Sequence, residues 1–228
     1  MTFRKIYWLI AIAGVLCVAA APPVAAKEKP PEEWDGLRKT KIKGLGLAYV
    51  RPGADMSIYS KIILDPLQVE FSKNWKPEAP GSNRKLSQQD MDTVKQRLTD
   101  LATETFTKEI SSDGGYPVVT ERGPDVMRIS AALLDVYVTA PDVGSPGLTR
   151  TYVADTGRMT LIAELRDSET NALFARVVDA REARNSQTLS LSNRAENAHE
   201  AGKIVREWAR ILRRQLDAVR ANPKGADE

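Results

Sequence analysis

The chain has 228 residues, of which 33 are Lys or Arg and 30 are Asp or Glu, with one cysteine and one histidine. Its net charge of +3 is too small to indicate a nucleic-acid partner, which would require a clustered excess of basic residues. A single histidine excludes zinc sites built on histidine pairs, and no cofactor is expected.

The first 26 residues have the order of regions that is typical of a secretory signal peptide. Basic residues at positions 4 and 5 precede an apolar run over 6–21, and small residues follow. Val24 and Ala26 supply the small residues that cleavage needs at the third-last and last positions, so we predict cleavage between Ala26 and Lys27. A competing site before Pro22 would place proline directly beyond the cut. We therefore predict export, to the periplasm or the outer membrane.

Cys17 lies at the end of the apolar run, where a bacterial lipoprotein carries the cysteine that receives its lipid. Leu16, directly before it, is bulkier than the small residue that lipoprotein processing favours, so we interpret Cys17 as an apolar residue of a discarded helix. Lipidation of Cys17 is the alternative. An uncleaved anchor is a third interpretation, although 16 apolar residues are fewer than the roughly 20 that span a bilayer.

Removal of this leader leaves 31 basic and 30 acidic residues, a net charge of +1, and no cysteine. Neither disulfides nor cysteine-bound metal would then stabilise the exported protein, and a Cys-His nucleophile is excluded. A chain of about this length can bury roughly 70% of its unfolded surface in a single domain. We therefore expect one domain with an ordinary apolar core.

The exported part is predicted to begin with a flexible lead-in over 27–44, rich in Lys, Glu and Pro, before a single domain over 45–222 and a disordered tail over 223–228. Within that domain, 45–50 and 61–71 have strand character. Residues 67, 69 and 71 are apolar and alternate with polar ones, the two-residue period of a half-buried strand. Pro66 cannot donate to a ladder, so this strand is predicted to lie at an edge or to contain a bulge.

A helix is predicted to follow the polar loop at 76–86. Ser87 and Asp90 resemble a capping box, with Asp in place of the more usual Glu or Gln. From Met91 to Ile110, apolar residues recur every three to five positions and form one stripe, which the glycines at 114 and 115 end.

Most of the sheet is expected after this helix. Residues 116–121 and 126–138 are β-rich, and a loop with two prolines and two glycines covers 140–147. The strongest strand pattern lies at 158–166, where apolar and polar residues alternate; a turn at 167–171 and a returning strand at 172–180 complete a predicted antiparallel hairpin.

The last element is a predicted helix over 193–221, ended by Asn222 and Pro223. One side is apolar, with Trp208 as a principal core anchor, and the other side is basic. The order of elements predicts an α+β fold, in which two helices pack on one face of a twisted antiparallel sheet of about five strands.

Four segments carry a resemblance to a known family. The stretch YVRPGADMSIYSKIILDP at 49–66 resembles the opening motif of a bacterial envelope family catalogued as domain of unknown function 3313. The helix that starts at Leu86-Ser87, the hairpin at 164–173 and the segment at 208–213 are also similar to it. Many members look like lipoproteins. The resemblance covers about residues 45–220 and implies an envelope protein without an established activity, so it supplies no catalytic residues.

No constellation of residues indicates a reaction. We interpret His199 as a solvent-facing helix residue, with a Ser-His-Asp triad as the formal alternative. The aspartates that we considered as paired carboxylates are interpreted as turn formers or solvated strand positions, except that Asp135 is predicted to be buried with a partner. They are Asp55, Asp65, Asp135, Asp155, Asp167 and Asp179. The turn at 51–55 lacks the pattern of a phosphate loop, and we expect it to place Tyr59 against the sheet.

The leading hypothesis is a non-catalytic interaction or structural module, in the periplasm or at the outer membrane, that acts by contact with proteins or other envelope components. A first alternative is a hydrolase or small-ligand binder that uses carboxylates of the loop at 140–157. A second alternative is binding to anionic membrane surface through basic residues of the last helix. These are Arg206, Arg210, Arg213 and Arg214. The sequence gives no oligomeric state.

Overall fold

The computed structural model describes residues 29–73, 75, 87–137, 151–153, 158–182, 190–192 and 194–222. The predicted signal peptide, its cleavage site after Ala26, Cys17 and the loop at 140–147 lie outside these residues. Residues 31–228 belong to one compact unit. Its described part contains two helices, α1 (Gln88–Ser111) and α2 (Arg194–Ala221). Its strands are β1 (Glu33–Trp34), β2 (Leu37–Thr40), β3 (Leu47–Val50), β4 (Lys61–Leu64), β5 (Gln68–Phe71), β6 (Val126–Tyr137), β7 (Thr151–Val153), β8 (Arg158–Asp167), β9 (Leu173–Glu182) and β10 (Ser190–Ser192).

Eight of these strands form one mixed sheet. Its order is β1-β2-β3-β9-β8-β6-β4, with β5 also paired to β6, and β7 and β10 form a separate two-stranded sheet. The α+β class is therefore confirmed, but the prediction of about five antiparallel strands was wrong in two respects. The sheet is larger, and β4 and β5 run parallel to β6.

The parallel pairing follows from the position of α1 in the chain. The helix connects β5 to β6, and a helical crossover is the usual way to return to the same sheet in the same direction. The predicted interruption at Pro66 is confirmed, because β4 and β5 are two short segments along the same neighbour. The predicted strand at 116–121 was wrong: in the described residues it forms only an isolated bridge, between Val118 and Ile62.

The segment predicted to be a flexible lead-in contains β1 and β2. Asp35 and Gly36 join these strands with positive φ angles of 54° and 75°, the backbone of a tight hairpin turn that favours an Asp-Gly pair. Leu37 follows this turn and is fully buried in a small cluster with Tyr49 and Leu173. The high content of Lys, Glu and Pro led to the prediction of a flexible segment, although the segment also contains the buried Leu37 and the Asp35-Gly36 turn.

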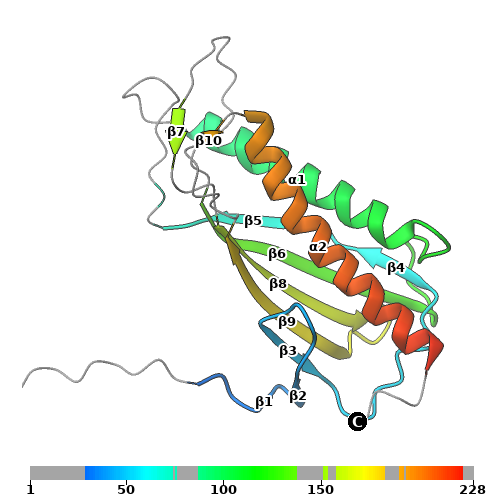
Figure 1. The fold of residues 1–228 in the computed structure, drawn as a ribbon. Coiled ribbons are helices and arrows are strands. Elements are labelled where there is room, and N and C mark those ends of the chain that lie inside the picture. Colours follow the sequence, from blue (N-terminus) through cyan, green and yellow to red (C-terminus); the bar gives the residue numbers. More distant parts are fainter. Residues whose placement is uncertain are drawn as a thin grey trace, which may run out of the picture. The chain divides into compact units, whose positions relative to one another are not determined.

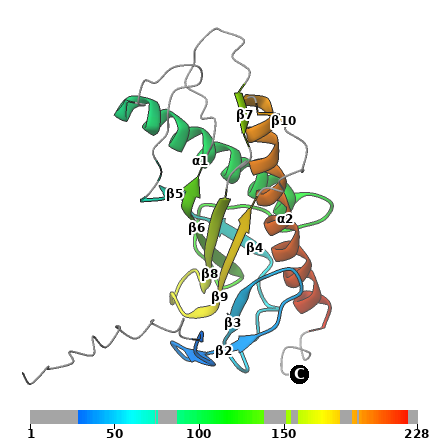
Figure 2. The ribbon, with the colours of Figure 1, turned by 60° about the vertical axis from the view of Figure 1, so that its left-hand side comes forward.

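Both helices lie over the same face of the sheet, as Figures 1 and 2 show. The capping box of α1 is confirmed, with the Ser87 hydroxyl accepting from the Asp90 backbone N–H. The Trp208 side chain is 1% exposed, which confirms it as a core residue of α2. The main core lies between the helices and the apolar face of β6, β8 and β9.

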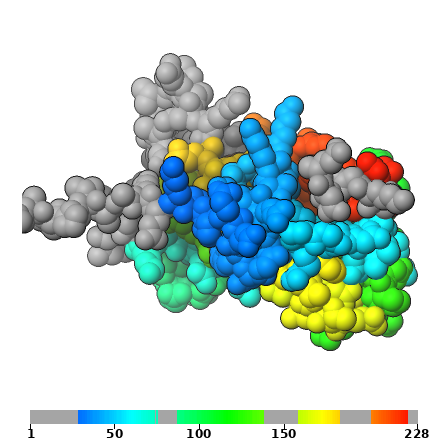
Figure 3. Space-filling view, turned by 90° about the horizontal axis from the view of Figure 1, so that it is seen from below, coloured from blue at the N-terminus to red at the C-terminus, as the bar shows by residue number. Residues whose placement is uncertain are grey.

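The hairpin of β8 and β9 is confirmed, with a long antiparallel register and a turn around Asp167. One carboxylate oxygen of Asp167 accepts the Thr170 N–H at 2.6 Å, and the other accepts the Tyr59 hydroxyl at 2.7 Å. Tyr59 is thus held against the sheet, as predicted. Figure 3 shows the blue N-terminal strands beside the yellow segment around this turn, in agreement with the pairing of β3 to β9.

Candidate functional site: the open face of the sheet

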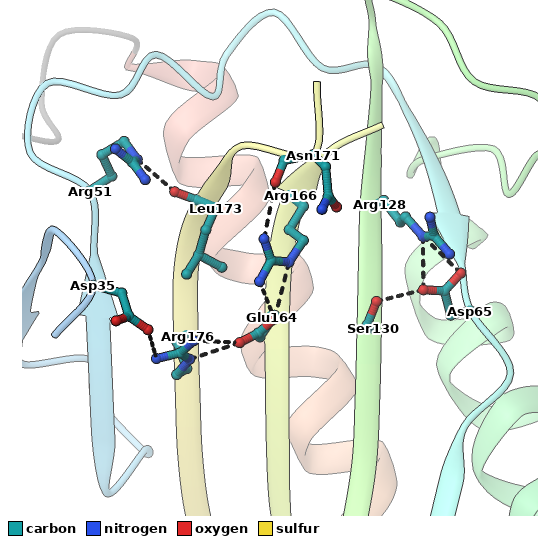
Figure 4. A network of polar contacts seen from close by, with 10 residues as sticks. All are labelled: Asp35, Arg51, Asp65, Arg128, Ser130, Glu164, Arg166, Asn171, Leu173 and Arg176. Carbon is teal, nitrogen blue, oxygen red and sulfur yellow. Dashed lines mark hydrogen bonds and ion pairs between the residues drawn. The ribbon is translucent and has the colours of Figure 1, made fainter. Parts of the chain in front are cut away.

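The face of the sheet opposite the helices carries an ordered set of polar side chains. We call this surface the open face. It is formed by alternate residues of β6, β8 and β9, namely Arg128, Ser130, Ala132, Leu134, Thr160, Ile162, Glu164, Arg166, Arg176 and Val178. In Figure 4 the helices lie behind the strands and the labelled side chains project in front of them. Every one of these residues is partly exposed.

Arg176 is at the centre of the larger network. Its guanidinium contacts Asp35 and Glu164, each at 2.8 Å, and the second of these carboxylates also pairs with Arg166 at 2.7 Å. Arg166 in turn donates to the Asn171 carbonyl at 3.0 Å (Figure 4). Because carboxylates fix both guanidiniums, these long side chains are held in defined positions on the surface.

A second network joins β6 to the segment after β4. The single Nε–H of Arg128 is shared between the two carboxylate oxygens of Asp65, at 3.0 and 2.9 Å, and the Ser130 hydroxyl donates to one of them at 2.5 Å (Figure 4). Asp65 was interpreted as a turn former or a solvated position. It is instead a partly buried partner of an arginine, placed by the interruption of the strand at Pro66.

The hydrogen bonds of these networks lower the pKa values of their carboxyl groups. Burial by itself would raise the pKa of Asp65, but the bonds from Arg128 and Ser130 lower it below its ordinary value. The pKa of Glu164 is lowered in the same way, against the effect of burial, by Arg166 and Arg176. Both groups are therefore charged at neutral pH.

An exposed aromatic side chain adjoins the larger network. Trp34 is 41% exposed, and the Arg176 guanidinium lies 4.1 Å from the centre of its ring. The Trp34 and Tyr49 rings also pack edge to face, with 5.6 Å between their centres. The β1–β2 hairpin thus places a large apolar surface at the border of the open face. Composition gave no sign of this, but the Asp35-Gly36 turn signal was available in the sequence.

The basic residues predicted to form an anionic-partner surface are mostly engaged within the protein. Arg206 and Arg210 both contact Glu109 of α1, at 3.5 and 3.2 Å, and Arg214 lies 3.6 Å from Glu207. Arg213 pairs with Asp217 at 2.8 Å and donates to carbonyl oxygens at the end of α1. These contacts join the two helices and balance much of the charge. Membrane binding through this surface stays a prediction.

Two of the other aspartates have the role predicted for them, and two do not. Asp55 and Asp167 are turn formers as predicted, and the Asp55 carboxylate accepts the Ser57 N–H at 2.9 Å. Asp135 was predicted to be buried, but its side chain is 53% exposed and lies 3.5 Å from Arg158 at a bulge of β6. Asp179 was also misjudged, because it is buried against α2.

Three predicted features fall where the structure gives no test. Asp155 and most of the loop at 140–157 lie outside the described residues, and for His199 only the backbone of α2 is described. Among the described residues, no group of three His, Cys, Asp or Glu side chains is arranged to hold a metal ion. Nor does the described part contain a helix that is long and apolar enough to cross a membrane.

The fold defines a two-layer α+β protein, with helices on one side of a mixed sheet and charged pairs on the other. The chain belongs to the family described as Protein of unknown function (DUF3313), whose sequence model matches residues 29–212. This match confirms the resemblance noted in the sequence. A search of curated proteins gives no match.

Two solved structures illustrate the distant similarities of the fold. A PelC dodecamer from Paraburkholderia phytofirmans is 11% identical, with 73% of this chain and 96% of that chain covered and a TM-score of 0.36. A Xanthomonas campestris protein of the DUF330 family is 13% identical, with 74% and 95% covered and a TM-score of 0.35.

Proposed function

We propose that this protein is a non-catalytic module of the bacterial cell envelope that binds a partner protein through its open face. The observation that carries the proposal is the Trp34–Arg176 pair. Tryptophan and arginine are the residues most enriched among those that dominate the energy of protein interfaces. Here they lie in contact, positioned by Asp35 and Glu164, beside half-buried aliphatic side chains.

The charge of the open face favours a protein as the partner. The two networks contain three arginines, at 128, 166 and 176, and three carboxylates, at 35, 65 and 164. A balanced surface of this kind has little attraction for anionic lipid or nucleic acid, which bind to an excess of basic charge. The open face is instead complementary to a protein surface that also carries both polar and apolar residues. Such a partner would accept hydrogen bonds from the ordered arginines and cover the aliphatic residues of the open face.

Site-specific photo-crosslinking in cells tests this interface. A photoreactive residue at Ile162, in the middle of the open face, is expected to give a discrete crosslinked product with one protein. The same residue at Arg214, which is 60% exposed on α2, serves as the control and is expected to give none. Crosslinking from Arg214 but not from Ile162 would place the contact on the helices and reject the proposed surface.

The envelope location rests on the predicted leader and on the family resemblance, and it needs its own test. We expect the intact mass of the protein purified from cells to correspond to a chain that starts at Lys27. A mass that corresponds to a diacylated chain starting at Cys17 would make it a lipoprotein and keep the envelope location. Unprocessed protein recovered from the cytosol would contradict export.

A further inference from the structure

A cavity of about 390 Å³ lies between the C-terminal half of α2 and the covered face of the sheet. It is independent of the open face and of the function proposed for it. The helix contributes one apolar stripe to its wall, at the spacing that places side chains on a single side. This stripe consists of Trp208, Ile211, Leu212, Leu216 and Val219.

The opposite wall is the covered face of β8 and β9, where two alanines lie among the larger Leu161, Leu165 and Val177. The alanines are Ala163 of β8 and Ala175 of β9, two strands that pair with each other. Both lie on the covered face and line the cavity together with Val50 of β3. Alanines at these positions leave space that larger residues would fill. Protein interiors are normally packed as densely as organic crystals, so an apolar space of this size is the feature expected of a ligand site and not of a simple core.

A buried polar cluster joins α2 to the sheet through Trp208, which lines the cavity. The Asp179 carboxylate accepts the Trp208 indole N–H at 2.6 Å, the Gly46 N–H at 2.8 Å and the Arg181 Nε at 2.9 Å. It thereby ties α2 and the segment between β2 and β3 to β9. These bonds fix the distance between the helix and the sheet, so the helix cannot simply settle onto the alanines.

The cavity is lined by one charged residue, Lys41, which is exposed to solvent and therefore lies at its mouth. Thr40, Lys41 and Ile42, from the segment between β2 and β3, line it. Figure 2 shows this segment beside α2, and the contact is close, since a Cβ added to Gly44 would lie 3.0 Å from the Ile211 side chain. Among the described residues, neither Lys41 nor its neighbour Lys43 has an ion-pair partner. No carboxylate lines the cavity.

We propose that this cavity binds the hydrocarbon chain of a single-chain carboxylate of the fatty-acid class, with the carboxylate at Lys41. The volume of the cavity fits one hydrocarbon chain. A cavity of about 150 Å³ holds the six carbons of benzene, and at the same volume per carbon a cavity of about 390 Å³ holds roughly 16 carbons. A lipid with two chains would leave one of them outside. The apolar walls take the chain, and the unpaired ammonium at the mouth complements the head group.

Trp208 provides a direct probe because it lines the cavity. Titration of the purified protein with a dibrominated C18 fatty acid is expected to quench its fluorescence, with saturation at one equivalent. Vesicles of diacyl phospholipid at the same chain concentration are expected to quench weakly. Equal quenching by vesicles would identify a chain of a membrane lipid as the occupant and would overturn the single-chain assignment. Absence of quenching by the fatty acid would overturn the site itself.

A matched pair of variants locates the bound chain. Ala163→Leu places about three additional carbons in the cavity, so that about three carbons of the bound chain can no longer be buried there. The expected result is binding that is roughly 50-fold weaker. Ala132→Leu makes the same change on the open face of the neighbouring strand and is expected to leave binding unchanged. Ala175→Leu repeats the test from β9 if the first variant does not fold. Unchanged affinity in a folded Ala163 or Ala175 variant would overturn the site.

The head group is tested by comparison with a neutral ligand. The alcohol of the same chain length is expected to bind a few times more weakly than the fatty acid, because an exposed charge pair contributes at most about 1 kcal/mol. Lys41→Glu is expected to abolish this difference while the alcohol binds as before. A preference for the acid that persists in Lys41→Glu would contradict the assignment of the carboxylate to that lysine.

Discussion

The two faces of the sheet are built from the same strands, yet they differ in what holds them in place. On the covered face, buried residues of β6 and β8 such as Ile129 and Leu161 pack under the helices. On the open face, residues one position away, such as Arg128 and Ile162, are only partly buried, and the charged ones are ordered by ion pairs. Alternation along a strand thus separates a face that stabilises the fold from a face that is available for contact.

This difference sets an expectation for the effects of substitution. Burial of apolar surface stabilises the covered face, whereas exposed ion pairs contribute little to stability. An open face with arginines, carboxylates and Trp34 therefore adds little to the free energy of unfolding. The fixed positions of these side chains therefore favour binding of a partner more than they stabilise the fold.

The largest expected effect comes from the covered face. Ile129 is fully buried, and Ile129→Ala is expected to lower the free energy of unfolding by about 4 kcal/mol, through lost burial and the cavity that remains. Ile162→Ala removes the same atoms from the open face and is expected to cost about 1 kcal/mol. Urea unfolding measures both values. Equal costs would show that the open face is covered in the folded protein.

Removal of the buried carboxylate is expected to have the next largest effect. Asp179→Ala leaves the Trp208 and Gly46 N–H groups without their acceptor, and is expected to lower the free energy of unfolding by about 3 kcal/mol. Asp35→Asn removes a charge that is 57% exposed while keeping a residue type that accepts the positive φ of this turn, and is expected to cost less than about 1 kcal/mol. Thermal unfolding followed by circular dichroism compares the two. A mild effect at Asp179 would mean that α2 is not held through it.

The smallest expected effect is the dependence of stability on pH. The pKa values of Asp65 and Glu164 are lowered in the folded state, and that of Asp167 is lowered to about 2, chiefly by the Thr170 N–H and Tyr59. Their contribution is therefore present above their unfolded pKa values, near 4, and is lost as the pH falls below them.

We expect the melting temperature to be nearly constant from pH 7 to about pH 5 and to fall at lower pH. Asp65→Asn and Glu164→Gln should each flatten this decline and cost no more than about 1 kcal/mol at pH 7. Melting curves recorded from pH 7 to pH 2 provide the measurement. A decline of unchanged slope in both variants would show that these two networks are not its source.

Much of the fold was predictable because its signals are local. The alternation at 158–166, the capping box at Ser87 and the apolar stripe around Trp208 each depend on a few neighbouring residues, and each is confirmed. The parallel pairing of β4 and β5 with β6 was missed because strand direction depends on partners that are distant in the sequence. The β1–β2 hairpin was missed for another reason, since composition was given more weight than the Asp35-Gly36 turn.

The candidate site was harder to predict than the fold. Arginines on the last helix indicated a basic surface, but Glu109, which engages two of them, lies on the other helix. The open face arises only when β6, β8 and β9 are brought together, and Arg176 meets Asp35 across most of the length of the chain. Surfaces made from distant segments have no motif, so only their individual strands could be recognised in the sequence.

Co-purification from envelope extracts tests the central claim most directly, with wild-type protein compared with Trp34→Ala and with Arg214→Ala as the matched control. The account predicts that one protein is retained by the wild type and by Arg214→Ala and is lost with Trp34→Ala, while all three melt at nearly the same temperature. Retention of that protein by Trp34→Ala, with loss in Arg214→Ala, would contradict it.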